Sequence, residues 1–70
     1  MKVYVYFNPV TDTTTCYSDE LTRHTGIHLI QIIEAEETTL PITENWKGNG
    51  VEVGEVFVCN DDNENLIRTA

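Results

Sequence analysis

The sequence predicts one small domain of the α+β class, mostly β, in which four to six antiparallel strands form a small sheet or half-open barrel with one short helix. The 70 residues allow a single domain, residues 1–70, and no linker or repeat divides them. Val, Ile and aromatic residues gather in dense blocks, which is typical of strands. The five expected strands follow one another at spacings of about ten residues, which favours a barrel-like form over a helix packed on a sheet layer.

The composition indicates a folded chain despite its charge. Twelve Asp and Glu outnumber four Lys and Arg, so the net charge is −8 and the pI is near 4.3. High net charge combined with low hydrophobicity is typical of disorder. Here 40% of the residues are apolar, the mean hydropathy is only −0.28, and the apolar residues are clustered. We therefore expect a packed core.

The chain opens with a predicted strand, residues 2–7, whose valines and phenylalanine face one side while its tyrosines face the other. Asn8 and Pro9 end this strand, because proline cannot donate a hydrogen bond to a neighbouring strand. The polar, β-branched residues 11–15 predict a second strand, which folds back on the first and ends near Cys16.

Residues 18–25 predict the short helix, with Leu21 as its apolar anchor. Ser18 is a suitable N-cap, and the two acidic residues after it complement the partial positive charge of a first helical turn. Gly26 suits the left-handed residue that commonly follows a helix.

Residues 27–36 predict a strand, because their isoleucines favour extended backbone. Apolar residues on both faces indicate a position near the centre of the sheet, covered on both sides. The alternative is one long helix over residues 18–37. That helix would include Gly26, at a cost of about 1 kcal/mol relative to alanine.

The following segment predicts a strand over residues 42–46, a turn over residues 47–50 and a strand over residues 51–59. The turn contains an Asn-Gly pair, which tolerates positive φ. Simple alternation would divide the four valines of the last strand between two faces. A bulge or bend at Gly54 is expected to direct all four inward.

The last elements are a polar turn at residues 60–64 and a short strand at residues 66–68, which we expect to pair with residues 56–59. The turn is similar to the oxygen-rich start of a calcium-binding loop. It lacks the glycine needed for the sharp bend, since Leu66 stands there, and it lacks the distal bidentate Glu. We therefore interpret it as a solvated turn.

The charge and the apolar pattern exclude several classes of partner. Nucleic-acid phosphates and anionic lipids both require a positive protein surface. The longest apolar stretch, residues 27–33, is far shorter than the roughly 20 residues of a membrane span. No signal peptide is recognised, so we expect a cytoplasmic protein with Cys16 and Cys59 as core thiols; a disulfide between them is the alternative.

Two cysteines and two histidines match the ligand count of a tetrahedral zinc site, and the histidines are four residues apart. The cysteines lack the close C-x-x-C spacing of structural zinc motifs, and a glycine separates the histidines. We expect no cofactor, and a metal-binding module remains an alternative. Its ligands would be Cys16, His24, His28 and Cys59.

No constellation for catalysis is evident. Cys16 and His24 can be written as a nucleophile and base, but no third group or oxyanion loop accompanies them. The single serine, Ser18, is accounted for as a helix cap. Phosphate-binding and dinucleotide-binding motifs are missing. We expect a protein that is not an enzyme.

The carboxylates are the main candidate binding groups, because they occur in groups. On a strand, Glu34 and Glu36 point to one face about 7 Å apart, and like charges at this distance are unfavourable without a partner. The alternative is that they serve solubility alone. Tyrosines and Trp46 are further interface candidates, although the tyrosines also suit a core layer beneath the helix. The predicted partner-binding residues are Glu34, Glu36, Glu37, Glu52, Glu55, Asp61, Asp62, Glu64, Tyr4 and Tyr6.

In size, charge and lack of catalytic motifs, the chain resembles the small acidic inhibitors that bacteriophages encode, including anti-CRISPR proteins, anti-restriction proteins and DNA mimics. The resemblance implies a module that binds a basic, nucleic-acid-binding surface of a host protein in the host cytoplasm, with carboxylates in place of phosphates. No alignable motif carries it, so it assigns no residue. The alternative is a structural subunit that forms a homodimer or larger homo-oligomer through an edge strand or the tyrosine face.

Overall fold

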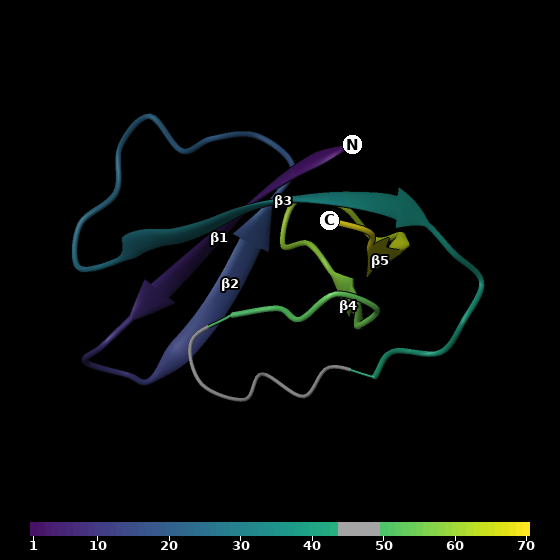
Figure 1. Cartoon of the computed structure of the whole chain (residues 1–70). Helices are drawn as coiled ribbons and strands as arrows, with labels where there is room; N and C mark the ends of the chain where they lie inside the picture. Colours follow the sequence, from purple (N-terminus) through teal and green to yellow (C-terminus); the bar gives the residue numbers. More distant parts are fainter. Residues whose placement is uncertain (44–49) are drawn as a thin grey trace.

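The computed structural model describes residues 1–43 and 50–70 of the chain. This part of the chain forms five strands and no helix (Figure 1). The strands are β1 (Lys2–Asn8), β2 (Thr13–Tyr17), β3 (His28–Glu37), β4 (Val56–Val58) and β5 (Asn65–Arg68).

All strand pairs are antiparallel, and the order in the sheet is β2-β1-β3-β5-β4. β3 is ten residues long and lies at the centre, which confirms the strand predicted from the isoleucine-rich segment. β1 and β2 form the predicted hairpin, and β4 and β5 form a second one. The prediction of a small antiparallel sheet is therefore confirmed.

A register shift between Val5 and Tyr6 interrupts the pairing of β1 with β3. Val5 lies opposite Gln31 and Tyr6 lies opposite Leu29, so Ile30 is the extra residue of a β-bulge. Ile30 packs against the core. The bulge increases the twist of the sheet, which helps the two outer strands to approach each other.

The two edge strands, β2 and β4, meet and make the sheet a nearly closed barrel. The amide of Asn60 donates to the carbonyl of Cys16 at 2.8 Å, and the Cys16 thiol donates to the carbonyl of Val58 at 3.3 Å. The amide and the hydroxyl of Ser18 both donate to the Asp61 carboxylate at 3.0 Å. We call this contact between the end of β2 and the chain around the end of β4 the seam.

The core fills the inside of the barrel, and each of its side chains is at most 2% exposed. Their burial is the main stabilising contribution, on the order of 1.5–3 kcal/mol for each large apolar side chain. The cluster consists of Val3, Val5, Cys16, Ile33, Ala35, Val51, Phe57, Cys59 and Leu66.

The helix predicted over residues 18–25 is wrong, because these residues form an irregular loop. Ser18 caps no helix and is bound to Asp61 across the seam, while the amide of Leu21 donates to the Tyr6 hydroxyl at 2.9 Å. Eight residues are too few for a stable helix without strong packing, so these tertiary hydrogen bonds determine the path of the chain. Gly26 does adopt the predicted positive φ, 77°.

The strand predicted over residues 51–59 is much shorter in the structure, where only β4 forms. Gly54 has a φ of 89°, so the predicted bend is confirmed. The prediction that all four valines point inward is wrong: Val51 and Val56 are buried, but Val53 is 64% exposed. Val53 lies in the turn itself, where a side chain reaches solvent.

Val51 is held in the core by the side chain of Gln31, although it belongs to no strand. Its amide donates to Gln31 Oε1 at 2.8 Å, and Gln31 Nε2 donates to its carbonyl at 3.2 Å. The Arg68 guanidinium donates to the same carbonyl. A Cβ at Gly50 would lie 2.5 Å from Gln31 Oε1, so a larger residue there would displace the Gln31 amide from Val51. We call this arrangement the Gln31 clamp.

The structure covers only part of two other predicted elements. Trp46 and most of the strand predicted at residues 42–46 lie outside the described residues, as does the turn predicted at residues 47–50 apart from its last residue. Thr43 is described, and its amide donates to the carbonyl of Val56 at 3.1 Å. Within the described ranges, no helix is long and apolar enough to cross a membrane.

Candidate protein-binding surface

The outward face of β3 carries a row of exposed side chains that changes from apolar to acidic along the strand. Leu29 is 38% exposed and Ile32 is 56% exposed, and Glu34 and Glu36 follow on the same face. The side chains between them alternate inward, with Ile33 and Ala35 buried in the core. We call this set the outer row: Leu29, Ile32, Glu34 and Glu36.

The bulge in the β1–β3 pairing explains how Leu29 and Ile32 share a face although they are three residues apart. Leu29 lies opposite Tyr6, and Ile32 lies opposite Tyr4. Directly opposed residues of antiparallel strands point to the same face, and the two tyrosines are themselves two residues apart. The four side chains of the outer row therefore share one surface, as predicted for its two glutamates.

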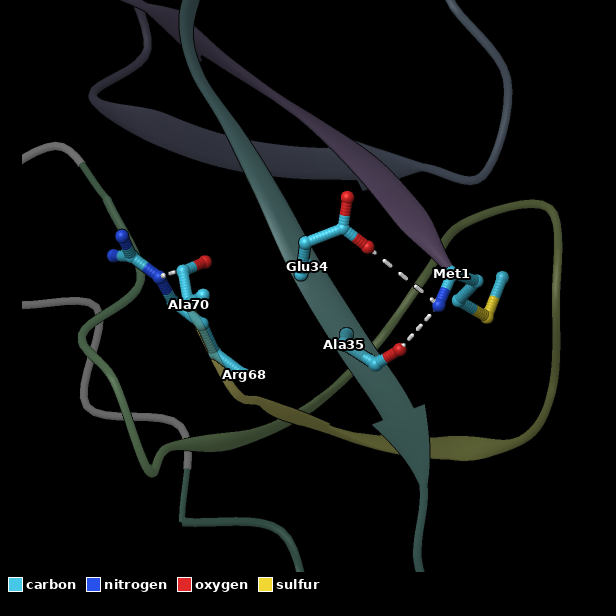
Figure 2. A network of polar contacts seen from close by, with 5 residues as sticks. All are labelled: Met1, Glu34, Ala35, Arg68 and Ala70. Atoms are coloured by element: carbon cyan, nitrogen blue, oxygen red, sulfur yellow. Dashed lines mark hydrogen bonds and ion pairs between the residues drawn. The ribbon is translucent and has the colours of Figure 1, made fainter.

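Glu34 is the only carboxylate with an ion-pair partner in residues 1–43 and 50–70. The N-terminal ammonium of Met1 donates to the carbonyl of Ala35 at 2.6 Å and lies 3.8 Å from Glu34 Oε2 (Figure 2). The guanidinium of Arg68 is engaged elsewhere, since its Nε donates to the carbonyl of Ala70 at 3.2 Å. Among the residues that the structure describes, Glu36 has no ion-pair partner.

Glu37 and Glu64 lie together at the end of β3. They line an open depression of roughly 500 Å³ with Thr38 and Thr39. The hydrogen bond from the Thr38 amide to the carbonyl of Asn65, at 3.0 Å, holds the two segments together. The structure therefore brings two predicted site residues from distant parts of the sequence next to each other.

Glu52 and Glu55 are the first and last residues of one turn around Gly54, and the amide of Glu55 donates to the carbonyl of Glu52 at 3.1 Å. The turn is attached to the end of β5, because the amide of Gly54 donates to the carbonyl of Arg68 at 2.9 Å. Glu64 precedes the opposite end of β5, about 10 Å or more away by strand geometry. The predicted carboxylates thus form several groups.

Asp61 and Asp62 serve the fold directly. Both carboxylate oxygens of Asp61 accept hydrogen bonds from Ser18 across the seam. Asp62 Oδ1 accepts the amide of Glu64 at 3.0 Å, which stabilises the turn between β4 and β5. Each therefore has an internal role that the sequence pattern did not reveal.

Tyr6 cannot present a surface to a partner, so its predicted binding role is wrong. It is 0% exposed, and its ring packs edge-on against Tyr17 at 5.8 Å and His24 at 5.3 Å between centroids. The loop after β2 covers it, anchored by the bond from Leu21 to the Tyr6 hydroxyl. Tyr4 is half-buried beside the outer row. Tyr6 therefore belongs to a buried layer, as the alternative interpretation predicted, but a loop and not a helix covers it.

The four residues of the alternative zinc site are not gathered. Cys16 and Cys59 are both buried at the seam, whereas His28 is exposed at the start of β3. His24 Nδ1 lies 3.1 Å from the carbonyl of Ile27. No group of three or more His, Cys, Asp or Glu that could hold a metal ion occurs among the described residues, which include these four.

Leu29 and Ile32 are candidate binding residues that the sequence analysis missed. Both were expected to be covered, because apolar residues on both faces suggest a buried central strand. The sequence analysis did not ask how much chain is available to cover a second face. In the described part of the chain, all five strands enclose the core, so no further strand or helix covers the outer face of β3. Comparing the number of apolar side chains on both faces of this strand with the number of segments that could pack on them would have indicated that one face stays exposed.

Comparison with known proteins gives no match: no protein-family model, no curated protein and no solved structure is similar to this chain at a significant level.

Proposed function

We propose that this chain is a non-enzymatic protein-binding module, a small acidic inhibitor of the phage type, whose outer row engages a basic, nucleic-acid-binding surface of a host protein. The observation that carries the proposal is the outer row itself. Two exposed apolar side chains and two carboxylates lie on one face of the central strand. The row spans about 20 Å by strand geometry, which is the scale of a protein interface.

The chemistry of the row matches what such a partner requires. The carboxylates provide negative potential that attracts a basic surface and aligns the two proteins. Leu29 and Ile32 provide apolar area, which is desolvated at the centre of stable interfaces. A partner whose basic residues are occupied by these carboxylates cannot bind phosphates with the same residues, so inhibition follows by competition.

Two other carboxylates lie at the end of β3, just beyond the outer row, and add negative potential there. The pair at the end of β3, Glu37 and Glu64, lines an open depression beside the two threonines. A net charge of −8 also adds a long-range attraction towards any strongly basic protein.

Self-association is less well supported than a basic partner. Tyr6 is buried and cannot contribute to a self-association surface, and the end of β2 is joined at the seam to the residue that follows Cys59. A dimer through the outer row would bring Glu36 of one copy near acidic residues of the other, which like-charge repulsion opposes. A sedimentation measurement at micromolar concentration checks this, and a monomer is expected.

The test uses purified basic nucleic-acid-binding proteins of the host as probes, first in binding and then in competition with duplex DNA. We expect capture of one of them at low ionic strength, weakening as salt rises, because charge pairs at an interface are screened. Added DNA should displace the module. Binding that is unchanged well above physiological ionic strength contradicts the proposal.

A matched pair of variants locates the binding surface. The double variant Glu34→Gln/Glu36→Gln removes two charges from the outer row, and Glu52→Gln/Glu55→Gln removes two charges from the turn around Gly54. We expect the first to weaken binding about tenfold, equivalent to about 1.4 kcal/mol, and the second to weaken it less. Equal losses from both variants would show that only net charge matters.

A further inference from the structure

The two cysteines meet at the seam although 43 positions separate them in the sequence. Cys16 belongs to β2, and Cys59 directly follows β4. Both are present as thiols, with exposed fractions of 1% and 2%. They belong to the same core cluster.

Backbone hydrogen bonds fix the two residues side by side. The amide of Asn60, the residue after Cys59, donates to the carbonyl of Cys16 at 2.8 Å. The Cys16 thiol lies 3.3 Å from the carbonyl oxygen of Val58, the residue before Cys59. The thiols are also within hydrogen-bonding reach of each other. These contacts place Cys16 beside Cys59, as formation of a disulfide between them requires.

We propose that Cys16 and Cys59 form a redox-sensitive site, which reacts with a low-molecular-weight disulfide such as oxidised glutathione to give an intramolecular disulfide that locks the barrel. The Cys59 thiolate attacks one glutathione sulfur and releases the first glutathione. The Cys16 thiolate then attacks the Cys59 sulfur of this mixed disulfide and releases the second. The two thiol protons pass to the released glutathione molecules, so one disulfide is consumed and one is formed.

The surroundings of Cys59 suit it as the first nucleophile. The Cys16 thiol can donate its hydrogen bond to the Cys59 thiolate in place of the Val58 carbonyl, which lowers the pKa of the Cys59 thiol, while burial and the carboxylates of Asp61 and Asp62 oppose this shift. Because both sulfurs are buried, the oxidant reaches them when the seam opens locally. Among the described residues, the hydrogen bonds across the seam join only the end of β2 and Ser18 to Val58, Asn60 and Asp61, so we expect the seam to open without global unfolding.

The disulfide would bind two segments that now meet only through non-covalent contacts. These are the end of β2, which leads into the loop that covers Tyr6, and the start of the turn between β4 and β5. In the loop-entropy model, a crosslink over this separation raises the folding equilibrium constant by roughly a hundredfold or more. The oxidised form is therefore the more stable one, and its seam opens less often.

The experiment treats the folded, reduced protein with excess oxidised glutathione and follows its mass and thiol content. We expect both thiols to disappear together in a monomer that has lost two hydrogen atoms. Urea denaturation should show the gain in stability, and added dithiothreitol should reverse it. Hydrogen exchange of the Asn60 amide, which crosses the seam, should slow at least tenfold, while the Arg68 amide serves as an internal reference.

The single variants Cys16→Ser and Cys59→Ser are the controls, and each should take up at most one glutathione. The double variant should show no effect of oxidant on stability. The proposal is overturned when the folded wild type keeps both thiols while the urea-unfolded chain oxidises. It is equally overturned when oxidation joins separate chains or lowers the stability of the monomer.

Discussion

The seam and the outer row use polar groups in opposite ways. At the seam, the Asp61 carboxylate accepts three hydrogen bonds from Ser18. On the outer row, the Glu36 carboxylate has no hydrogen bond or ion pair with any described residue, and Ile32 is 56% exposed. Both regions contain acidic residues that look equivalent in the sequence.

This difference separates the residues that hold the fold from those that remain available. We group the polar contacts at the seam with the Gln31 clamp and call them the closing contacts. No buried side-chain nitrogen or oxygen in the described ranges lacks a hydrogen-bond partner. Substitutions in the closing contacts should therefore change stability, whereas substitutions in the outer row should mainly change binding.

The largest effect is expected for Gly50→Ala in the Gln31 clamp. The new Cβ would lie 2.5 Å from Gln31 Oε1, so the amide must move and lose its bonds to Val51. We expect a loss of about 2 kcal/mol in the free energy of unfolding, measured by urea denaturation.

A double-mutant cycle isolates the cause of this loss. In the Gln31→Ala background the clash is absent, so Gly50→Ala should cost much less than in the wild type. Equal costs in both backgrounds would show that the clamp is not the reason for glycine at this position.

An intermediate effect is expected for Asp61→Ala, which removes the acceptor for Ser18 at the seam. We expect a loss of about 1 kcal/mol, because the site is exposed and water replaces part of the interaction. Glu64→Ala is the matched control, since it removes one carboxylate from the same turn without a side-chain hydrogen bond. A larger loss for Glu64→Ala than for Asp61→Ala would contradict the comparison.

The smallest effect on stability is expected for Glu36→Gln in the outer row. It removes a charge without a partner from a chain with net charge −8, so the change should lie within about 0.5 kcal/mol and be neutral or stabilising. Thermal denaturation at low ionic strength measures it. A clear destabilisation would assign Glu36 a structural role and remove it from the binding surface.

The strands were predictable because their signals are local. Alternation in β1 and the isoleucines of β3 favour extended backbone whatever their neighbours are. The loop at residues 18–25 was not predictable, because Ser18 and its neighbours fit a helix start equally well. Its path depends on Asp61, a residue 43 positions away.

The candidate surface was predictable only in part. The spacing of Glu34 and Glu36 placed them correctly on one face, since residues two apart on a strand always share a face. Leu29 and Ile32 escaped notice because exposure depends on what covers a face. The sequence predicts Tyr6 as an interface residue or as part of a core layer, and the loop after β2, which buries it, decides between the two.

The amino-acid order alone determined the extended segments, the bends at Gly26 and Gly54 and the excess of negative charge. These follow from backbone preferences and from counting ionisable groups. Only the folded barrel decided which carboxylates accept internal hydrogen bonds and which apolar side chains stay in water. It also decided that the two cysteines become neighbours. The reason is that each of these outcomes depends on contacts between residues far apart in the chain, and such contacts exist only after the sheet has closed.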